Sequence, residues 1–486
     1  MPSSAEDRIG IAVLGAGPAG LTAAHVLSRN SCAGRVFEAE GQVGGIAKTI
    51  EFEGYRFDLG GHRFYTRLPS VHRLWEEMLG DEFTLRSRLS RIYYKGRFFN
   101  YPLRAEDVFR RLGLIESARC ALSYLAARTR FWAGEPRTLE DWVVSRFGRR
   151  IYDDFFSTYT QKVWGVPGSE IQAEWAGQRI QDFSLMKALL GMLRLVRRPA
   201  PTAIEEFHYP RLGPGQMWEA FRDSVEDRGI AVDMHSRCVG VRHDAGRVTS
   251  VIIDRDGHES EHGVEGLVST LALPDLIRTL DPEPPVSVQE AASRLSFRNL
   301  CLVALMIDRE LPFPDNWIYL HDPGTFAGRV QNFGAWSEGM VRPGTACLGV
   351  EYFCNDEDEI WRMSDTEAVD LAVSEMASIG LIDPKLVTNG VKVQVPLAYP
   401  VYDTGYREAV AEIRGYLESL ENLQTCGRNG LHRYNNQDHS MWTAALATMN
   451  LVDGGDRDVW SINSEGEYLE QPDEIEGELE GIEVAG

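Results

Sequence analysis

The sequence contains no long apolar run and no excess of basic residues. None of its apolar stretches approaches the roughly 18 residues needed to span a membrane, and the N-terminal stretch MPSSAEDRIG lacks the apolar core of a signal peptide. The formal charge is −22, from 50 basic and 72 acidic residues. So acidic a surface repels nucleic-acid phosphates and anionic membranes, although a few buried arginines could still bind a small anion. We therefore expect a cytoplasmic protein with no nucleic-acid partner and no membrane partner.

Closely spaced cysteine pairs are also absent. The sequence has seven cysteines, and no two of them form a C-x-x-C motif. A scattered, odd-numbered set in a chain of 486 residues is typical of reduced thiols rather than of disulfides. Their spacing matches no common metal site, so we expect no bound metal. The cysteines are Cys32, Cys120, Cys238, Cys301, Cys347, Cys354 and Cys426.

Strand-like and helix-like segments alternate along most of the chain. A strand, a glycine-rich turn, a helical pattern and a second strand occupy residues 11–37. Residues 105–200 are mainly helix-like, whereas strand-like runs dominate 231–270. The helical stretch 185–198 has four basic residues beside an apolar side, which fits either a packed helix or a helix lying on a membrane surface. The tail, 464–486, is acidic and poor in large apolar residues, and we expect it to be disordered.

The sequence GAGPAG, which begins at Gly15, matches the G-x-G-x-x-G dinucleotide-binding motif. In this motif Gly15 makes the tight turn, Gly17 lets a pyrophosphate approach the backbone, and Gly20 lets helix and strand pack closely. Ala19 lies in the first turn of the helix, whose free N–H groups face the diphosphate. Glu38 ends the second strand, where an acid hydrogen-bonds ribose hydroxyls and repels a 2′-phosphate. The agreement of strand, helix and acid predicts a dinucleotide other than NADP.

A second glycine pair follows this unit. After Glu38-Ala39, the run GGIAKT from Gly44 to Thr49 resembles the E-A-x(n)-G-G-x-A-x-T signature of FAD-dependent oxidoreductases related to the amine oxidases. This resemblance implies FAD contacts at Gly44, Gly45 and Lys48, and we also expect Val239 to contact the cofactor. Residues 267–274 resemble the strand that returns to the FAD domain in that superfamily, although an ordinary buried strand has the same pattern.

Several separated motifs resemble those of the UDP-galactopyranose mutases and their relatives. The likeness extends over residues 10–452. Gly60-Gly61-His62 resembles the mutase loop beside the flavin, and the run KVWGVP from Lys162 resembles part of the mutase cap. The run GRVQNF around Arg329 and the segment from Gly427 to Ser440 resemble two further mutase motifs.

The resemblance implies a role for each matching residue. Arg329 and Arg428 would grip a diphosphate and assist its departure, and His62 would lie beside the flavin, so these three are the candidate catalytic residues. Taken singly, each could instead be an ion-paired arginine or a hydrogen-bonded loop histidine. The expected substrate-binding residues are Tyr101, Arg104, Trp164, Arg179, Trp317, Tyr319, Arg329, Tyr399, Arg428, Tyr434 and Asn436. The remaining expected FAD contacts are Gly61, Gly427, Asn436, Gln437 and Ser440.

Two places depart from the mutase pattern. Residues 101–104 are Tyr-Pro-Leu-Arg where the fungal-type mutases have Tyr-Pro-Phe-Gln. Leu103 removes an aromatic face and Arg104 replaces a neutral amide at the position that holds the base. Ile204 stands where those mutases offer an Asn to the ligand. The diphosphate grip is retained while base recognition is altered, so we expect a UDP- or dTDP-linked sugar rather than UDP-galactose specifically.

The resemblance implies an α/β fold with a Rossmann-type FAD-binding domain, a β-sheet substrate domain and an inserted, mostly helical cap. Because strands and helices interleave, the domains are expected to be discontinuous. The expected FAD unit is 8–70, rejoined by about 231–280 and 421–455. The expected sheet domain comprises 71–104, 201–230 and 281–420, and the expected cap is 105–200.

The implied activity is that of a flavin-dependent nucleotide-sugar mutase of carbohydrate biosynthesis. In this isomerase reaction N5 of reduced FAD attacks the anomeric carbon, the nucleoside diphosphate leaves, and pyranose and furanose forms interconvert. FAD must first be reduced, with NADPH or NADH as the expected reductant. The alternatives are an FAD-dependent oxidase or dehydrogenase of the amine oxidase or protoporphyrinogen oxidase type, and a flavoprotein without catalysis that binds a nucleotide or a partner. The sequence does not indicate the oligomeric state.

Overall fold

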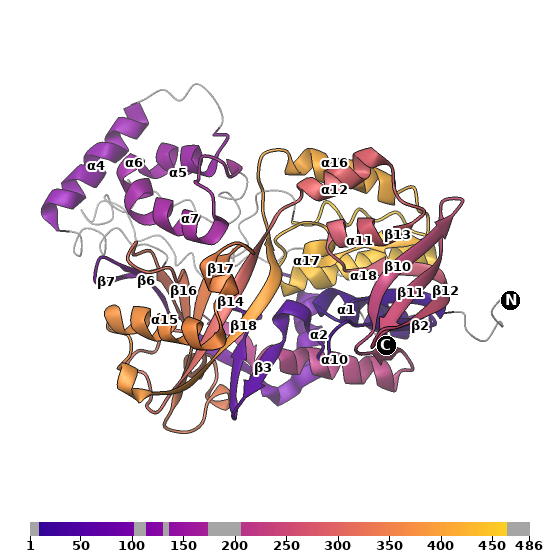
Figure 1. The fold of residues 1–486 in the computed structure, drawn as a ribbon, viewed down its shortest axis with the longest axis horizontal. Coiled ribbons are helices and arrows are strands. Elements are labelled where there is room, and N and C mark those ends of the chain that lie inside the picture. The colour runs from indigo at the N-terminus through magenta and orange to yellow at the C-terminus, as the bar shows by residue number, and fades with distance from the viewer. Residues whose placement is uncertain (1–8, 102–112, 130–135, 174–205, 464–486) are drawn as a thin grey trace.

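Two large β-sheets, each with its own helices, organise the chain, and a further group of helices forms a cap beside one of them (Figure 1). The computed structural model describes residues 9–101, 113–129, 136–173 and 206–463. The expected α/β fold is confirmed. Among these residues no helix is both long and apolar enough to cross a membrane.

The first sheet has eight strands around a parallel core. Its strands are β1 (Ile9–Leu14), β2 (Gly34–Phe37), β9 (Ala231–Asp233), β10 (Arg237–Asp244), β11 (Arg247–Arg255), β12 (His258–Ser269), β13 (Leu280–Asp281) and β19 (Leu423–Thr425). Their order is β13-β10-β11-β12-β1-β2-β9, with β19 also paired to β12. β1 lies between β2 and β12 and is parallel to both. A strand covered on both faces must be apolar almost throughout, as the run IGIAVL of β1 is.

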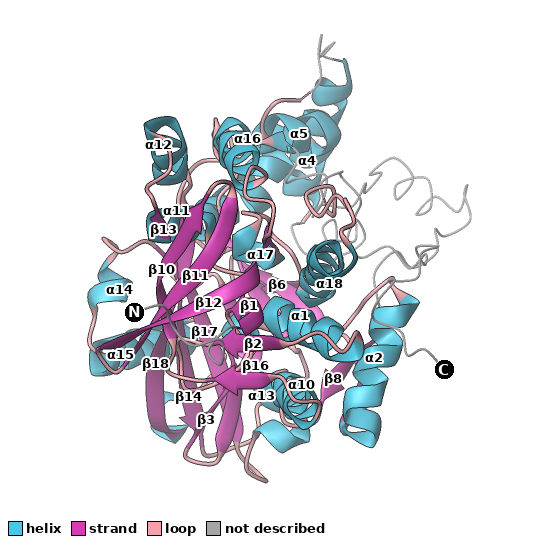
Figure 2. Cartoon of the chain, turned by 90° about the vertical axis from the view of Figure 1, so that its right-hand side faces the viewer, coloured by secondary structure: helices cyan, strands magenta, loops and turns pink. Residues whose placement is uncertain are grey.

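Among the described residues, eight helices pack around this sheet, and the sheet and these helices together form the nucleotide-side half. They are α1 (Pro18–Arg29), α2 (Pro69–Leu79), α10 (Gly215–Asp227), α11 (Leu273–Thr279), α12 (Val286–Arg294), α16 (Tyr406–Leu417), α17 (Gly427–Gly430) and α18 (Gln437–Asp453). Figure 2 shows α1 and α18 beside the parallel strands, with α10 and α2 next to them. α1 begins with Pro18, whose fixed φ suits the first helical position.

The second sheet has seven strands, and it forms the part of the molecule that we name the sheet half. Its strands are β6 (Ser90–Tyr94), β7 (Arg97–Asn100), β14 (Phe297–Ile307), β15 (Trp317–Leu320), β16 (Arg329–Asn332), β17 (Ala346–Cys354) and β18 (Val387–Pro400), in the order β18-β14-β17-β16-β15-β6-β7. All pairs are antiparallel except β6 with β15. One face packs against α15 (Asp365–Ser378), where Ala368, Ala372 and Met376 are buried. The residues at the alternate positions along these strands point to the opposite face of the sheet.

Shorter elements connect the two halves. Two ribbons pair β3 (Thr49–Phe52) with β4 (Tyr55–Asp58) and β5 (Phe83–Ser87) with β8 (Glu206–Pro210). The short helices outside the cap are η2 (Gly45–Ala47), η3 (Gly80–Glu82), α13 (Phe333–Trp336), η5 (Glu338–Met340), α14 (Glu359–Arg362) and η6 (Pro384–Leu386).

The packing differs from the expected domain boundaries in several segments. α2, α10, α12 and α16 fall within the ranges expected for the sheet domain, but their apolar residues join the core under the first sheet. β4 shows the reverse, because Tyr55 and Phe57 are buried in the core of the sheet half. The reason is physical: an amphipathic element packs on whichever apolar surface the chain path brings beside it.

The cap consists of helices in its described part. They are α4 (Leu114–Thr129), α5 (Leu139–Phe147), α6 (Arg149–Ile151), a π-helical turn η4 (Tyr152–Ser157) and α7 (Thr158–Trp164). α5 begins with a capping box in which Thr138 and Asp141 satisfy each other's backbone N–H groups. The stretch 185–198 and the acidic tail lie outside the described residues.

Candidate functional site

The glycines after β1 form a narrow backbone surface. Gly15 has φ +95°, and its N–H donates to Phe37 O at 2.8 Å. A Cβ on Gly20 would lie 1.8 Å from the carbonyl oxygen of Gly15, so no side chain fits there. A Cβ on Gly17 would instead have the Cα of Gly45 as its nearest neighbour at 3.7 Å, an ordinary contact. The first and third glycines are therefore required by the fold itself, whereas Gly17 faces space that a ligand can use.

Glu38 lies at the end of β2 with its carboxylate held by backbone donors. Oε2 accepts from the N–H of Ala16 at 2.7 Å, and Oε1 accepts from the N–H of Glu40 at 2.9 Å. Each oxygen retains a further lone pair, so the group can accept ribose hydroxyls as well. Lys48 forms an ion pair with Glu40, so its ammonium is partly neutralised beside this site.

The second glycine pair lies against the first motif. Gly44 and Gly45 have φ +103° and +54°, and Gly44 N–H donates to Ala16 O at 2.8 Å. A Cβ on Gly45 would lie 3.3 Å from the Cα of Gly17. Two loops without side chains therefore approach each other at the start of α1, which is the shape that a flat or extended diphosphate group requires.

The segment from Gly427 to Ser440 also lies at the start of α1, beside the first glycine motif. Gly427 has φ +82°, its N–H donates to Thr443 Oγ1 at 3.0 Å, and a Cβ on it would lie 2.9 Å from Cβ of Ala19. Gln437 accepts a hydrogen bond from Trp218 Nε1 at 3.0 Å, while its Nε2 is buried without an acceptor. An unsatisfied buried donor at the start of α18 fits a bound cofactor, because such groups are rarely left without a partner.

The other residues expected to touch the cofactor have these positions. Asn436 precedes α18 without capping it through its side chain, and the buried Ser440 donates its N–H to Asn436 O at 3.0 Å. Val239 lies at a β-bulge between Cys238 and Gly240 with 39% of its surface exposed. If Val239 contacts the cofactor as expected, its bulged backbone is better placed to do so than a buried side chain would be.

Strand register brings Arg329 to the centre of the sheet face opposite α15. Arg329 pairs across the strands with Tyr319 on one side and Glu351 on the other. Its Nε donates to Glu351 Oε2 at 2.7 Å and its Nη2 donates to Tyr399 Oη at 3.3 Å. Glu351 is fully buried and also accepts from Gln331 Nε2. Burial lowers the pKa of Arg329, but the Glu351 carboxylate outweighs this effect and keeps the guanidinium charged.

Arg428 reaches the same place from α17. Its Nε donates to Asn435 O at 2.9 Å and its Nη1 to Ala398 O at 3.1 Å. The guanidinium lies 4.6 Å from the ring centre of Tyr434, which stacks on Tyr399 at 5.5 Å and 11°. Within the described part of the chain Arg428 forms no ion pair with a carboxylate. Its charge is thus not cancelled, unlike that of Arg329.

His62 lies close to the two arginines, Arg329 and Arg428. Burial lowers the pKa of His62 to about 3, and the positive charges of Arg428 and Arg329 act in the same direction. The imidazole is therefore neutral near pH 7, and its buried Nδ1 has no hydrogen-bond partner among the described residues. The Gly60-Gly61 turn brings the loop close to the sheet, since a Cβ on Gly61 would lie 3.1 Å from Gln331 Nε2. The three candidate catalytic residues thus come together.

Aromatic side chains line the rest of the site. Tyr319 lies 4.7 Å from Tyr101 and 6.3 Å from Trp317, between ring centres, and Trp317 stacks on Trp336 at 5.3 Å. Trp164, at the end of α7, meets Tyr399 edge to face at 6.5 Å. Arg104 and Arg179 lie outside the described residues.

The sequence reasoning missed three members of the site. Tyr159 of α7 packs edge to face on Tyr319 at 5.7 Å, and burial raises the pKa of Tyr159 while Arg329 opposes that shift. Glu351 holds Arg329 from the neighbouring strand β17, and Gln331, two residues after Arg329 on β16, donates to the other oxygen of Glu351. The glutamate within the apolar strand LGVEYFC could have indicated a buried ion pair from the sequence alone, because a buried carboxylate requires a partner. Tyr159 carried no such signal in its helix.

Comparison with known proteins assigns the fold to a group of flavoproteins. The profile of a family described as flavin containing amine oxidoreductase matches residues 18–402. A crystal structure of reduced UDP-galactopyranose mutase is similar, with a TM-score of 0.84 and 19% identity over 94% of this chain and 96% of that chain. A putative protoporphyrinogen oxidase from Exiguobacterium sp. 255-15 has a TM-score of 0.68 and 14% identity over 92% and 99%. Cyclohexylamine oxidase from Brevibacterium oxydans IH-35A has a TM-score of 0.60 and 13% identity over 92% and 100%. These likenesses show the fold.

Proposed function

The chain belongs to the flavin containing amine oxidoreductase family, and from this premise we propose that it is an FAD-dependent mutase of a nucleoside-diphosphate sugar. The proposed reaction interconverts the pyranose and furanose forms of a UDP- or dTDP-linked sugar without net oxidation. The resemblance to UDP-galactopyranose mutase in fold and in separated sequence motifs supports the reaction class.

The observation that carries this proposal is the pair of arginines among tyrosines. Arg329 and Arg428 both act electrostatically on His62, and Tyr399 contacts both guanidinium groups. An oxidase acting on an apolar amine has no anionic group in its substrate for two guanidinium groups to bind. A nucleoside diphosphate does, because planar guanidinium groups bind its oxygens in pairs.

The residues at the first sheet fit FAD. The backbone of Gly15 and Gly17, the Glu38 carboxylate, the Gly44-Gly45 pair and the free Nε2 of Gln437 would hold it. When bound and reduced, FAD supplies the nucleophile for the anomeric carbon. NADPH or NADH is the reductant we propose.

The protein side chains then have distinct tasks. Arg428, which has no carboxylate partner in the described part of the chain, provides the net positive charge that receives a diphosphate. Arg329, held rigidly by Glu351, orients the same group and stabilises the charge that develops as the diphosphate departs. Neutral His62 adds no third positive charge, and its free Nδ1 can accept or donate one hydrogen bond at the reaction centre. Aromatic rings line the site and exclude water from it, namely those of Tyr319, Tyr399 and Trp164.

The decisive experiment is to titrate the flavin absorbance of the FAD-bound protein with UDP, dTDP and their sugars, before and after dithionite reduction. We expect a perturbed spectrum and turnover of a sugar nucleotide only after reduction. Absence of any nucleotide response, with oxygen consumed when amines or porphyrinogens are supplied, would replace the mutase by the oxidase alternative. Nucleotide binding without turnover in either redox state would indicate a flavoprotein without catalysis.

A further inference from the structure

The loop between β15 and β16 joins the cap to the sheet that carries the site. Lys162 of α7 inserts its ammonium group into this loop. Its Nζ donates at 2.7–3.1 Å to four oxygen atoms, those of the carbonyls of Leu320, Asp322 and Ala327 and the hydroxyl of Thr325. An ammonium group has three protons, so these converging oxygens occupy all of its donors.

The lysine is partly buried and charged at once. Burial lowers the pKa of Lys162 to about 8, while the carboxylates of Glu375 and Asp322 oppose that shift. At neutral pH the group is still protonated. Without it, the loop carbonyls in this interface would lose their donor, and buried carbonyls without a donor are costly.

The opposite side of the same loop is held from the sheet half. Glu375 of α15 accepts the backbone N–H groups of Phe326 at 2.5 Å and Ala327 at 3.2 Å, and it also accepts from Tyr352 Oη at 3.1 Å. The loop is thus clamped between a glutamate on helix α15 of the sheet half and a lysine on helix α7 of the cap. Moving α7 away would break only the lysine side of this arrangement.

α7 also carries two residues of the site. Tyr159 lies three positions before Lys162 and packs on Tyr319, and Trp164 lies two positions after it and packs on Tyr399. A second anchor is Arg298 of β14, whose Nη2 and Nε donate to the carbonyls of Lys162 and Val163, both at 3.2 Å. The π-helical turn η4 comes directly before this helix, and such turns occur often at functional sites.

We propose that Lys162 is a positioning residue, which clamps α7 onto the β15–β16 loop and thereby places Tyr159 and Trp164 against the arginine-tyrosine site. This role deepens the proposed function, on which it rests. Lys162 does not touch the reacting atoms. It acts through the two aromatic residues that close the site from the cap side.

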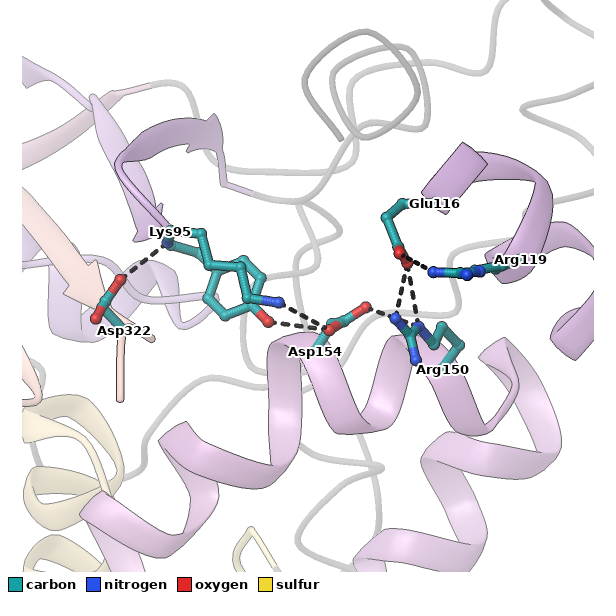
Figure 3. A network of polar contacts seen from close by, with 7 residues as sticks. Lys95, Glu116, Arg119, Arg150, Asp154 and Asp322 are labelled. Atoms are coloured by element: carbon teal, nitrogen blue, oxygen red, sulfur yellow. Dashed lines mark hydrogen bonds and ion pairs between the residues drawn. The ribbon is translucent and has the colours of Figure 1, made fainter. Parts of the chain in front are cut away.

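A second, exposed set of contacts reaches the same loop and provides a matched control. In Figure 3 the backbone N–H of Lys95 donates to the Asp322 carboxylate at 3.0 Å, and its ammonium lies 3.6 Å from Asp154, which continues to Arg150 and Glu116. The Lys95 side chain is 62% exposed. Exposed ion pairs are screened by solvent and contribute little to stability. Lys95→Met therefore removes a lysine near the same loop without removing a buried clamp.

The test compares Lys162→Met, Lys162→Arg and Lys95→Met in the full FAD-bound protein. Nucleotide affinity is measured by flavin absorbance with UDP and dTDP, steady-state kinetics by turnover of the reduced enzyme, and helix docking by hydrogen exchange of the amides of residues 158–164. For Lys162→Met we expect roughly tenfold weaker nucleotide binding, a KM that rises more than kcat falls, and faster exchange. Lys162→Arg should be intermediate, because a planar guanidinium cannot donate to all four converging oxygens. Lys95→Met should match the wild type.

The proposal is overturned if Lys162→Met keeps wild-type affinity and wild-type exchange in 158–164. If Lys162→Met fails to bind FAD, Lys162→Arg is compared with the wild type instead. Unchanged nucleotide affinity together with unchanged exchange of residues 158–164 in Lys162→Arg would then overturn the proposal. A wild-type protein that responds to no nucleotide refutes the proposed function instead. In that case the exchange of 158–164 still decides whether Lys162 holds α7.

Discussion

The nucleotide-side half and the sheet half build their parts of the site in opposite ways. In the first, backbone atoms of Gly15, Gly17 and Gly44 form a surface without side chains, which leaves space for a ligand. In the second, Arg329 of β16 and Tyr399 of β18 are joined by Arg428 of α17, a helix of the nucleotide-side half, and each is useful only because of the side chain it carries. A backbone site is encoded within one short motif. A side-chain site depends on strand register and on loops that are distant in the sequence.

This difference predicts how each half fails when it is altered. The largest effect is expected from Arg329→Ala, because it leaves the fully buried Glu351 carboxylate without its cation. Removing one partner of a buried ion pair costs about 3–5 kcal/mol of stability. Urea denaturation of the FAD-bound protein measures this loss. The double variant Arg329→Met with Glu351→Gln is the control, and it should recover stability without recovering nucleotide affinity. A single variant as stable as the wild type would contradict the ion pair.

Arg428→Met should affect binding rather than folding. Arg428 has no carboxylate partner among the described residues and donates only to two backbone carbonyls. Loss of its charge-assisted hydrogen bonds to a diphosphate should cost about 1.5–3 kcal/mol in UDP or dTDP affinity. Flavin absorbance titration gives the affinity, and thermal unfolding of the same sample gives the stability. Equal affinity in variant and wild type would remove Arg428 from the site.

In the nucleotide-side half, Gly17→Ala tests whether a ligand uses the free space beside this glycine. The protein accommodates the new Cβ, whose nearest neighbour would be 3.7 Å away. We expect the polypeptide to fold while FAD affinity falls by roughly tenfold to a hundredfold, about 1.4–2.8 kcal/mol. Gly20→Ala is the contrasting variant, since its Cβ would lie 1.8 Å from Gly15 O and must displace the backbone. Full FAD occupancy of Gly17→Ala would show that the cofactor approaches elsewhere.

A gradual effect, spread over several pH units, is expected from Asp58, at the end of β4 before the His62 loop. Burial raises the pKa of Asp58 to about 8, although hydrogen bonds from Tyr209 and Thr49 partly oppose the shift. The folded-state pKa is above the unfolded one, so its stabilising contribution is complete below about pH 4 and is lost as pH rises through about 8. The slope is at most about 1.4 kcal/mol per pH unit.

Urea midpoints measured from pH 5 to pH 8 test this behaviour. Asp58→Asn should remove the part of the decline that Asp58 causes, because the amide cannot titrate but keeps a similar shape. Glu40→Gln is a suitable control, since Glu40 is exposed and lies outside this buried cluster. A decline that is unchanged in Asp58→Asn would assign the pH dependence to other groups.

Sequence reasoning predicted the nucleotide-side elements more fully than the domain boundaries. The strand, glycine turn and helix at residues 9–29 lie in one continuous stretch, and the pattern alone indicates them. α10 and α12 were assigned to the sheet half but pack under the first sheet. Their sequences show an apolar face and not which core receives it, because burial depends on the path of the whole chain.

By itself the sequence determined the α/β class, the dinucleotide motif and the residue types of an anion site, since these depend on local periodicity and short spacings. Only the tertiary structure decided that Arg329 is neutralised by Glu351 while Arg428 is not, that His62 lies within the field of both, and that Lys162 anchors the cap. The physical reason is that charge compensation and burial are properties of atoms brought together from distant parts of the chain. Their energies depend on distances that no local pattern contains.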